Sequence, residues 1–125
     1  DIELDKLKPA KPKTGISKEN MEWLENLEAV ILNNLNNFGL TVDVISLEIA
    51  MSSPQIYRKT KELLGLTPTQ YINQIRFQEA RRMLEEKEYF SVKAVAYSVG
   101  FKAEKNFSKN FKKRFGKNPS EYLNG

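Results

Sequence analysis

The side chains best able to do chemistry in this chain are basic residues near its C-terminal end. Between Lys102 and Lys117, seven residues are basic and Glu104 alone is acidic. The seven are Lys102, Lys105, Lys109, Lys112, Lys113, Arg114 and Lys117. This density of positive charge predicts a polyanion as partner, although a solvated helix face that aids solubility would have a similar composition.

Catalytic side chains are scarce. The 125 residues contain no cysteine and no histidine, which excludes disulfides, thiolate zinc sites and the commonest acid–base and metal-binding groups. Glu85 and Glu86 are neighbours on a polar stretch, no pattern brings carboxylates together, and no glycine-rich phosphate loop is present. We therefore expect no enzymatic activity, no metal and no cofactor.

Charge is distributed unevenly along the chain. The net charge is +4 and the pI is near 9.2, yet residues 1–40 contain five lysines and seven acidic residues, which leaves a balance of +6 on residues 41–125. No apolar run approaches the roughly 18 residues needed to span a bilayer, and the chain begins without a basic leader or an initiator methionine. We expect a cytoplasmic fragment from the C-terminal part of a longer protein, without membrane contact.

The elements that must position the basic residues are predicted to be helices. Residues 1–16 hold two prolines and no apolar period, which is typical of a linker or tail. Ser17 is a good N-cap, and apolar residues follow it at three- and four-residue steps. These residues are Met21, Leu24, Leu27, Ile31 and Leu35. They predict an amphipathic helix that ends near Gly39, and because no later stretch alternates with period two, the predicted fold is all-α.

The second half of the chain contains two similar segments, residues 41–72 and residues 91–123. Each opens with a hydroxyl N-cap, Thr41 or Ser91, and a short apolar helix, and each continues after a tight turn into a longer helix. Along one face of the longer helix, Ile56, Thr60 and Leu64 match Phe107, Phe111 and Phe115. A short helix, a tight turn and a longer helix make up the helix-turn-helix plan, so each copy predicts one such unit.

Both copies close with the pattern G-x-x-P-x-x-Y-[IL], which starts at Gly65 and at Gly116. The glycine suits the left-handed end of a helix, and the proline suits the first position of the next one. A long helix joins the copies, with a predicted buried stripe of Ile72, Ile75, Ala80, Met83 and Leu84. The predicted organisation is a linker or tail at 1–16, a first helix-turn-helix subdomain at 17–67, a connecting helix at 68–86 and a second helix-turn-helix subdomain at 87–125.

Once the apolar faces point inward, helical geometry determines which side chains point outward. In the first longer helix the outward set and its flank are Pro54, Gln55, Tyr57, Arg58 and Lys61. In the second they are Lys105, Asn106, Lys109, Lys112 and Lys113. We predict these residues as the candidate nucleic-acid-binding surface.

Three outward side chains suit base edges. Arg58 and Lys109 occupy equivalent positions and can donate to guanine O6 and N7, whereas Asn106 can pair with adenine. Each of these residues alone would be an ordinary surface residue. The equivalent positions of Arg58 and Lys109 in the two copies are what favour a role in binding duplex DNA. Tyr57 has three open roles, namely packing beside Lys61, contact with a thymine methyl group, or donation to a phosphate. The phenylalanine stripe has the spacing of a core and not of a base-stacking platform.

The two copies resemble the DNA-binding domain of the AraC family of bacterial transcription regulators. The stretch SVKAVAYSVGFKAEKNFSKNFKKRFGKNPSEYL looks like the family signature, with Ala96, Gly100, Phe101, Phe107, Phe111, Phe115, Gly116, Pro119 and Tyr122 in place. The stretch YRKTKELLGLTPTQYINQIRFQEA is similar through Arg58, Gly65, Pro68, Tyr71, Ile72, Arg76 and Ala80. The resemblance covers roughly residues 17–123.

This resemblance implies two recognition helices in consecutive major grooves on one face of the DNA, with transcription as the output. The base-reading positions that it implies are Pro54, Tyr57 and Arg58 in the first copy and Lys105, Asn106, Ser108 and Lys109 in the second. Since Pro54 cannot hydrogen-bond to a base, the specificity of the first copy is expected to rest mainly on Tyr57 and Arg58.

Three positions depart from the family pattern. Thr60 stands where an aromatic residue is usual, Ala50 where the turn often has glycine, and Ser46 where a small apolar residue is usual. Thr60 and Ser46 are expected to lower the stability of the first copy.

The leading hypothesis from the sequence is sequence-specific binding of double-stranded DNA by the effector domain of a bacterial transcription regulator. The alternative is a helical protein-interaction module whose basic face meets an acidic partner. That alternative predicts an exposed apolar groove, whereas the apolar stripes are all assigned to the core. The family resemblance also implies RNA polymerase or a second copy of the regulator as partners through the parent protein, which usually carries a ligand-sensing or receiver region.

Overall fold

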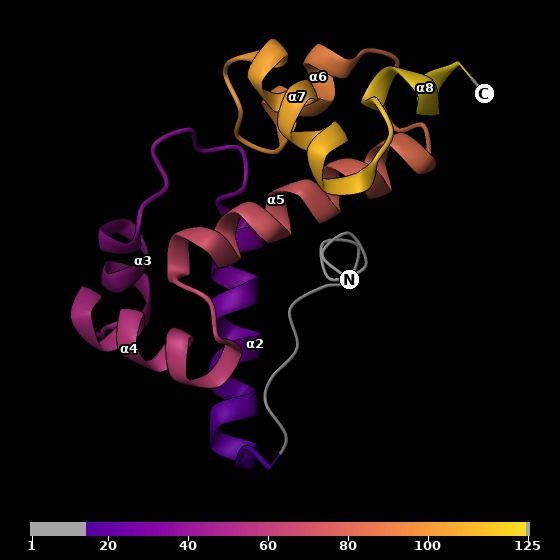
Figure 1. Cartoon of the computed structure of the whole chain (residues 1–125). Helices are drawn as coiled ribbons and strands as arrows, with labels where there is room; N and C mark the ends of the chain where they lie inside the picture. The colour runs from indigo at the N-terminus through magenta and orange to yellow at the C-terminus, as the bar shows by residue number, and fades with distance from the viewer. Residues whose placement is uncertain (1–14, 125) are drawn as a thin grey trace. The chain divides into compact units, whose positions relative to one another are not determined.

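The computed structural model describes residues 15–124, and Figure 1 shows the course of the chain. These residues form α-helices joined by turns, and no β-strand occurs among them. The helices are α2 (Lys18–Asn33), α3 (Val42–Ile49), α4 (Ser53–Leu64), α5 (Pro68–Glu85), α6 (Val92–Ser98), α7 (Glu104–Phe115) and α8 (Pro119–Leu123). The all-α prediction is confirmed, and most of the predicted linker or tail at 1–16 lies outside the described residues.

The described residues divide into two compact units. The first unit comprises residues 15–35 and 39–75, and the second comprises residues 36–38 and 76–124. The first contains α3 and α4, and the second contains α6 and α7, so each has a short helix, a turn and a longer helix in succession. This order confirms the two predicted helix-turn-helix units. Within residues 15–124, every helix is too short or too polar to cross a membrane.

Helix α2 begins at the predicted N-cap, where the Ser17 hydroxyl accepts a backbone N–H at 3.1 Å. It ends at Asn33, well before the predicted end near Gly39. The reason is Asn34, whose side chain donates to the Val30 carbonyl at 2.8 Å and so takes the acceptor that its own backbone N–H would use in a longer helix. A side chain that competes with the backbone therefore stops the helix.

The core of the first unit starts one turn later in α2 than the sequence predicts. Leu24, Leu27, Ile31 and Leu35 are buried, but Met21 is 40% exposed. The first turn of α2 borders an open hollow, which Asn20 lines together with Gln55 and Lys59 of α4, so α2 is not closely packed on α4 at this level. The assignment of Met21 to the buried stripe is therefore wrong.

The turn and caps of the first unit follow the sequence closely. Ala50 ends α3 in the left-handed conformation, with φ of 60°. Ser52 caps α4 and forms a capping box with Gln55. Thr60 is fully buried, and its hydroxyl donates to the Ile56 carbonyl at 2.7 Å, so the polar atom has a partner. The lower stability expected from Thr60 stays a prediction.

Ala50→Gly is expected to stabilise the first unit by about 0.5–1 kcal/mol. The left-handed conformation costs a non-glycine residue roughly 1–2 kcal/mol, and the greater entropy that glycine loses on folding offsets part of the gain. Urea denaturation monitored by circular dichroism gives the free energy of unfolding. Ala29→Gly, at an exposed position inside α2, is the control and should cost about 1 kcal/mol. Destabilisation by both changes would contradict the prediction.

The second unit is built on a chain of aromatic rings. Phe77 of α5, Phe101 of the α6–α7 turn and Phe107 of α7 lie in mutual contact, with ring centroids 4.9–5.7 Å apart. Phe107 also meets Phe111 at 5.7 Å, and both rings are buried. Phe115 is only half-buried and lies edge-on to Phe111 at 4.7 Å. The phenylalanine stripe is therefore core, as its spacing predicts, with Phe115 at its margin.

Arg76 is a buried cation that holds two turns of the second unit. It is 7% exposed, and its guanidinium donates to the Gly100 carbonyl at 3.3 Å and to the Asn37 carbonyl at 2.8 Å. Burial lowers the pKa of Arg76, although a guanidinium keeps its charge at neutral pH. The bond to Gly100 fixes the turn that leads from α6 to α7 and so helps to position α7.

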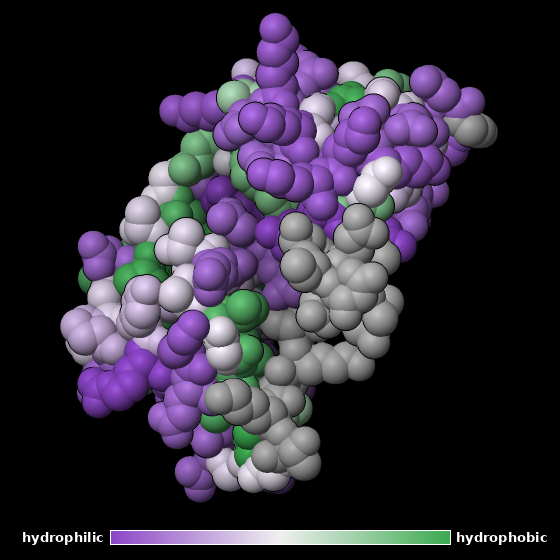
Figure 2. Space-filling view, viewed as in Figure 1, coloured by the Kyte–Doolittle hydropathy of each residue, from purple (hydrophilic) through white to green (hydrophobic). Residues whose placement is uncertain are grey.

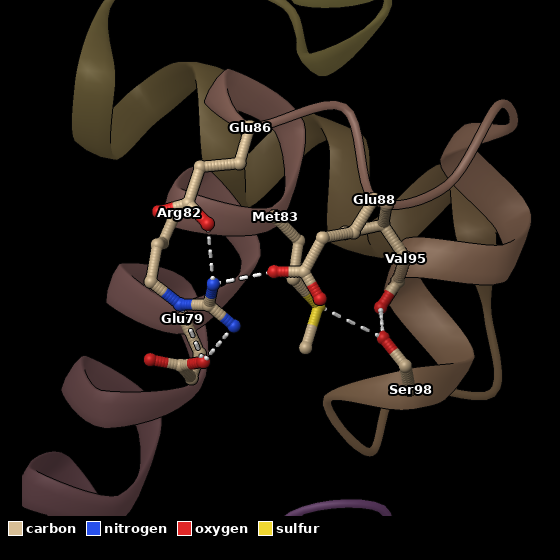
Figure 3. A network of polar contacts seen from close by, with 7 residues as sticks. All are labelled: Glu79, Arg82, Met83, Glu86, Glu88, Val95 and Ser98. Atoms are coloured by element: carbon tan, nitrogen blue, oxygen red, sulfur yellow. Dashed lines mark hydrogen bonds and ion pairs between the residues drawn. The ribbon is translucent and has the colours of Figure 1, made fainter.

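The end of α5 is tied to the residues that follow it by one arginine (Figure 3). The Arg82 guanidinium forms ion pairs with Glu79 at 2.7 Å, with Glu86 at 2.9 Å and with Glu88. Hydrogen bonds to Glu79 and Glu88 raise the pKa of Arg82 above its ordinary value. Because Glu88 lies beyond the helix, this network links the last turn of α5 to the loop before α6.

The predicted buried stripe of α5 is largely observed. Ile72, Ile75, Ala80 and Leu84 are buried. Met83 is half-buried, and its sulfur lies 3.2 Å from the Ser98 hydroxyl, which donates to the Val95 carbonyl at 2.8 Å (Figure 3). Met83 therefore joins α5 to α6 at the edge of the core.

Candidate nucleic-acid interface

The outward face of α7 carries four exposed lysines. They are Lys105, Lys109, Lys112 and Lys113. The inward face is defined by buried Phe107 and Phe111, and the α6–α7 turn held by Arg76 leads into the helix. None of the four lysines forms an ion pair with an acidic residue in residues 15–124, where the ion pairs involve Arg81 and Arg82. Figure 2 shows hydrophilic side chains covering α7 and α8 on the face in view. These lysines are free to meet a polyanion.

The outward face of α4 is less basic and partly aromatic. All five predicted residues, Pro54, Gln55, Tyr57, Arg58 and Lys61, are exposed. Arg58 and Tyr57 follow the buried Ile56 directly, and Lys61 donates to the Gly65 carbonyl at 3.2 Å. Lys61 therefore also caps the C-terminal end of α4, where a cation interacts favourably with the helix dipole.

The two faces share one register. Arg58 lies two residues after the buried Ile56, and Lys109 lies two residues after the buried Phe107. Both cations are exposed, so equivalent positions of α4 and α7 present side chains that can donate to guanine. On α7, Asn106 is exposed as well, and Ser108 is half-buried.

Hydrogen bonds limit what two of the predicted amides can offer. The Gln55 side-chain oxygen accepts from the Ser52 N–H at 3.0 Å in the capping box, which leaves only its amino group for a ligand. The Asn106 side-chain oxygen accepts from Asn110 at 3.2 Å. Paired recognition of adenine needs both the oxygen and the amino group of an amide, so Asn106 can pair in that way only after Asn110 releases it.

Arg114 does not belong to the free basic surface. Its guanidinium lies 4.8 Å from the centre of the Phe77 ring, and burial lowers its pKa. The helical register explains this position, because Arg114 follows the buried Phe111 by three residues and falls on the same side of α7. Of the seven basic residues between Lys102 and Lys117, Arg114 therefore packs on the core.

The sequence does not predict a cluster of Trp23, Met51 and Lys59 beside α4. The Trp23 indole N–H donates to the Met51 sulfur at 3.0 Å, and the Lys59 ammonium lies 4.9 Å from the centre of the Trp23 ring. An open hollow of about 240 Å³, whose lining includes Met51, Lys59 and Arg58, adjoins this group. The helical register places Trp23 at the edge of the α2 stripe, but nothing in the sequence indicates that it reaches the turn before α4.

The two units differ strongly in formal charge. Residues 15–35 and 39–75 contain four basic and seven acidic residues, a balance of −3. Residues 36–38 and 76–124 contain twelve basic and six acidic residues, a balance of +6. The attraction to a polyanion is therefore concentrated in the second unit.

Two helix-turn-helix units with exposed cations on their second helices define a double helix-turn-helix protein. The family model described as "Helix-turn-helix domain" matches residues 45–125. The chain belongs to this family, as a DNA-binding domain of the AraC type. The family is one of transcription regulators and not of enzymes.

Three known proteins illustrate the relationship. "Histidine kinase P4" of Formosa agariphila is 32% identical over 109 residues, which cover 87% of this chain and 8% of that protein. "HTH-type transcriptional activator RhaS" of Escherichia coli is 32% identical over 83 residues, which cover 66% of this chain and 30% of that protein. The chain thus spans less than a third of the length of these two relatives. The crystal structure of the DNA-binding domain of AdpA in complex with a target DNA is 28% identical with a TM-score of 0.70, over 81% of this chain and 89% of that one.

Proposed function

We propose that this chain binds specific sites in double-stranded DNA, with α4 and α7 as the two reading helices. The observation that carries the proposal is the shared register of Arg58 and Lys109, which are exposed at equivalent positions of the two units. An arginine or lysine at a recognition helix pairs with guanine O6 and N7 in the major groove. The AdpA domain, whose crystal structure is of a complex with a target DNA, supports the same use of the fold.

The remaining exposed residues divide by chemistry. Lys61, Lys105, Lys112 and Lys113 are point charges suited to phosphates, which set orientation without reading sequence. Tyr57 and Pro54 supply apolar contact, and Tyr57 also has a hydroxyl donor. On α7, Lys109 is proposed as the main base-reading side chain, because Asn106 is engaged by Asn110. Gln55 serves first as the cap of α4.

We expect a specific site to contain two recognition elements about 10 base pairs apart. A chain with two reading helices that enter consecutive major grooves on one side of the duplex spaces its contacts by one helical turn, about 34 Å. Hydroxyl-radical footprinting on a site selected from a random duplex pool measures this spacing. Protection of a single element would mean that one unit alone engages the DNA, and failure to select any site would reject specific binding.

Replacement of Arg58 or Lys109 with alanine is expected to cost about 1–3 kcal/mol of binding free energy at the preferred site and to relax base preference in one element only. The reason is that each side chain discriminates between bases in its own groove. Affinities for the selected duplex and for a scrambled duplex, measured at two salt concentrations, give the effect on specificity.

Lys113→Ala is the control for these two variants. As a phosphate contact, Lys113 should contribute equally to binding of all sequences. Its loss should therefore lower the affinity for both duplexes alike and make the slope of log affinity against log salt shallower by about one. If Arg58→Ala and Lys109→Ala behaved in this same way, neither side chain would read bases and the surface would be a general electrostatic one.

We further propose that the chain is the output domain of a longer regulator and acts in the cytoplasm, where bacterial DNA lies. One relative is named a histidine kinase and another a transcriptional activator, and this chain matches a small part of each. RNA polymerase or a second copy of the regulator is the proposed partner of the whole protein. Transcription from a promoter that carries the selected site, with and without the full-length protein, tests whether binding changes transcription.

A further inference from the structure

Four side chains of the second unit form a continuous exposed strip outside the recognition helix. The Lys93 ammonium lies 5.7 Å from the centre of the Tyr97 ring, Tyr97 meets Phe38 edge-on at 5.6 Å, and the Lys102 ammonium lies 5.3 Å from the centre of the Phe38 ring. Tyr97 is 44% exposed and Phe38 is 41% exposed. We call these four residues the α6 strip.

The polar groups at the surface of the α6 strip are suited to donating hydrogen bonds. Two ammonium groups and one phenol hydroxyl point to a ligand rich in acceptors. Neither Lys93 nor Lys102 forms an ion pair with any acidic residue between positions 15 and 124. The aromatic rings hold the two ammonium groups by cation–π contact, so less side-chain entropy is lost when an anion binds.

The position of the α6 strip in the helix-turn-helix unit indicates the anion. Lys93 lies in the first turn of α6, Tyr97 follows it by one turn, and Lys102 lies in the turn that leads into α7. In helix-turn-helix proteins the recognition helix enters the major groove, and the helix before it crosses the sugar–phosphate backbone. Lysine and tyrosine side chains on that first helix and on the turn are therefore placed to meet phosphates.

We propose that the α6 strip binds DNA phosphates beside the major groove that α7 enters. The second unit would then contact the duplex through two surfaces, the α6 strip and the outward face of α7. This inference rests on the proposed DNA binding. Charge favours DNA over an acidic protein segment, because the strip adjoins the lysine-rich α7 in a unit whose balance is +6. Lys93 and Lys102 supply the charge, Tyr97 donates its hydroxyl, and Phe38 supports the lysine and the tyrosine on either side.

The test uses the double variant Lys93→Gln/Lys102→Gln, which removes two charges from exposed positions. The logarithmic salt dependence of binding to the selected duplex should become shallower by about 0.9 for each lysine, or about 1.8 in all. The ratio of affinities for the selected and scrambled duplexes should stay unchanged, because phosphates carry no sequence information. Tyr97→Phe should lower the affinity for both duplexes by the same factor.

Lys117→Gln is the matched control. Lys117 is exposed and lies 4.4 Å from the centre of the Tyr122 ring, but it follows the C-terminal end of α7, away from the α6–α7 turn. The proposal would be overturned if the slope change per lysine in the double variant were no greater than the change in Lys117→Gln. A loss of affinity for only one of the two duplexes would also overturn it. If these variants bound normally while Arg58→Ala and Lys109→Ala lost base preference, the strip proposal alone would fail. Absence of DNA binding by the unmodified protein would instead reject the proposed function.

Discussion

Phe107→Ala is expected to lower the free energy of unfolding by about 3–5 kcal/mol. Phe107 is 1% exposed and contacts three other rings, those of Phe77, Phe101 and Phe111, at centroid distances of 5.3–5.7 Å. Its removal leaves a cavity that rigid aromatic neighbours cannot readily fill. Because a small domain has only about 5–15 kcal/mol of net stability, the loss removes a large part of it.

Chemical denaturation monitored by circular dichroism measures this loss. Lys112→Ala is the control, since Lys112 lies on the exposed face of the same helix and should change stability by less than about 0.5 kcal/mol. Two variants of equal stability would mean that the inward and outward faces of α7 have been assigned the wrong way round. The DNA affinity of the Phe107 variant should also fall, because α7 loses its support.

DNA affinity is expected to fall by about 100-fold or more between 50 and 200 mM salt. Four lysines suited to phosphates are exposed on the two reading helices, namely Lys61, Lys105, Lys112 and Lys113. Each neutralised phosphate contributes about −0.9 to the slope of log affinity against log salt, which gives a slope of about −3.6 or steeper. The displaced counterions gain more entropy at low salt, and this gain is what drives binding.

Fluorescence anisotropy with a labelled duplex, titrated across a salt series, gives the slope directly. Replacing the exposed Lys105 and Lys112 with glutamine removes two proposed phosphate contacts, so the slope should become shallower by about 1.8. An affinity that did not change with salt would show that the basic face of α7 does not meet nucleic acid.

The local elements of this protein follow from short stretches of sequence. Ser17, Ser52 and Thr67 each cap a helix through the backbone N–H of the residue three positions later. Gly65 and Gly116 adopt the left-handed conformation at the ends of α4 and α7. These features are predictable because the hydrogen bonds that define them join residues three or four apart, so the required neighbours are visible in the sequence.

The exposed positions of the candidate site were also predictable from the sequence. The residues predicted to face outward on α4 and α7 are exposed, because the opposite face of each helix is set by an apolar stripe of fixed period. Ser108, which only the family resemblance implied, is half-buried. Their roles in DNA binding stay a prediction. Periodicity could not show that Asn110 occupies the side-chain oxygen of Asn106, since that amide could equally have faced solvent.

Contacts between residues far apart in the sequence were decided by the tertiary structure alone. Arg76 donates to Asn37, 39 residues away, and Trp23 donates to Met51, 28 residues away. Phe38 completes the α6 strip from a loop more than 50 residues before α6, and no local pattern places it there.

Sequence patterns therefore predicted the helices apart from the end of α2, the two helix-turn-helix units and the outward faces of α4 and α7, because these depend on helical period and on neighbours within one turn. The tertiary structure alone decided that Met21 is exposed and that Arg114 packs on Phe77. It also decided which rings surround Phe107 and which lysines outside α7 lie on aromatic rings. The physical reason is that burial depends on which segments meet in three dimensions, and the spacing of residues along one helix does not specify that.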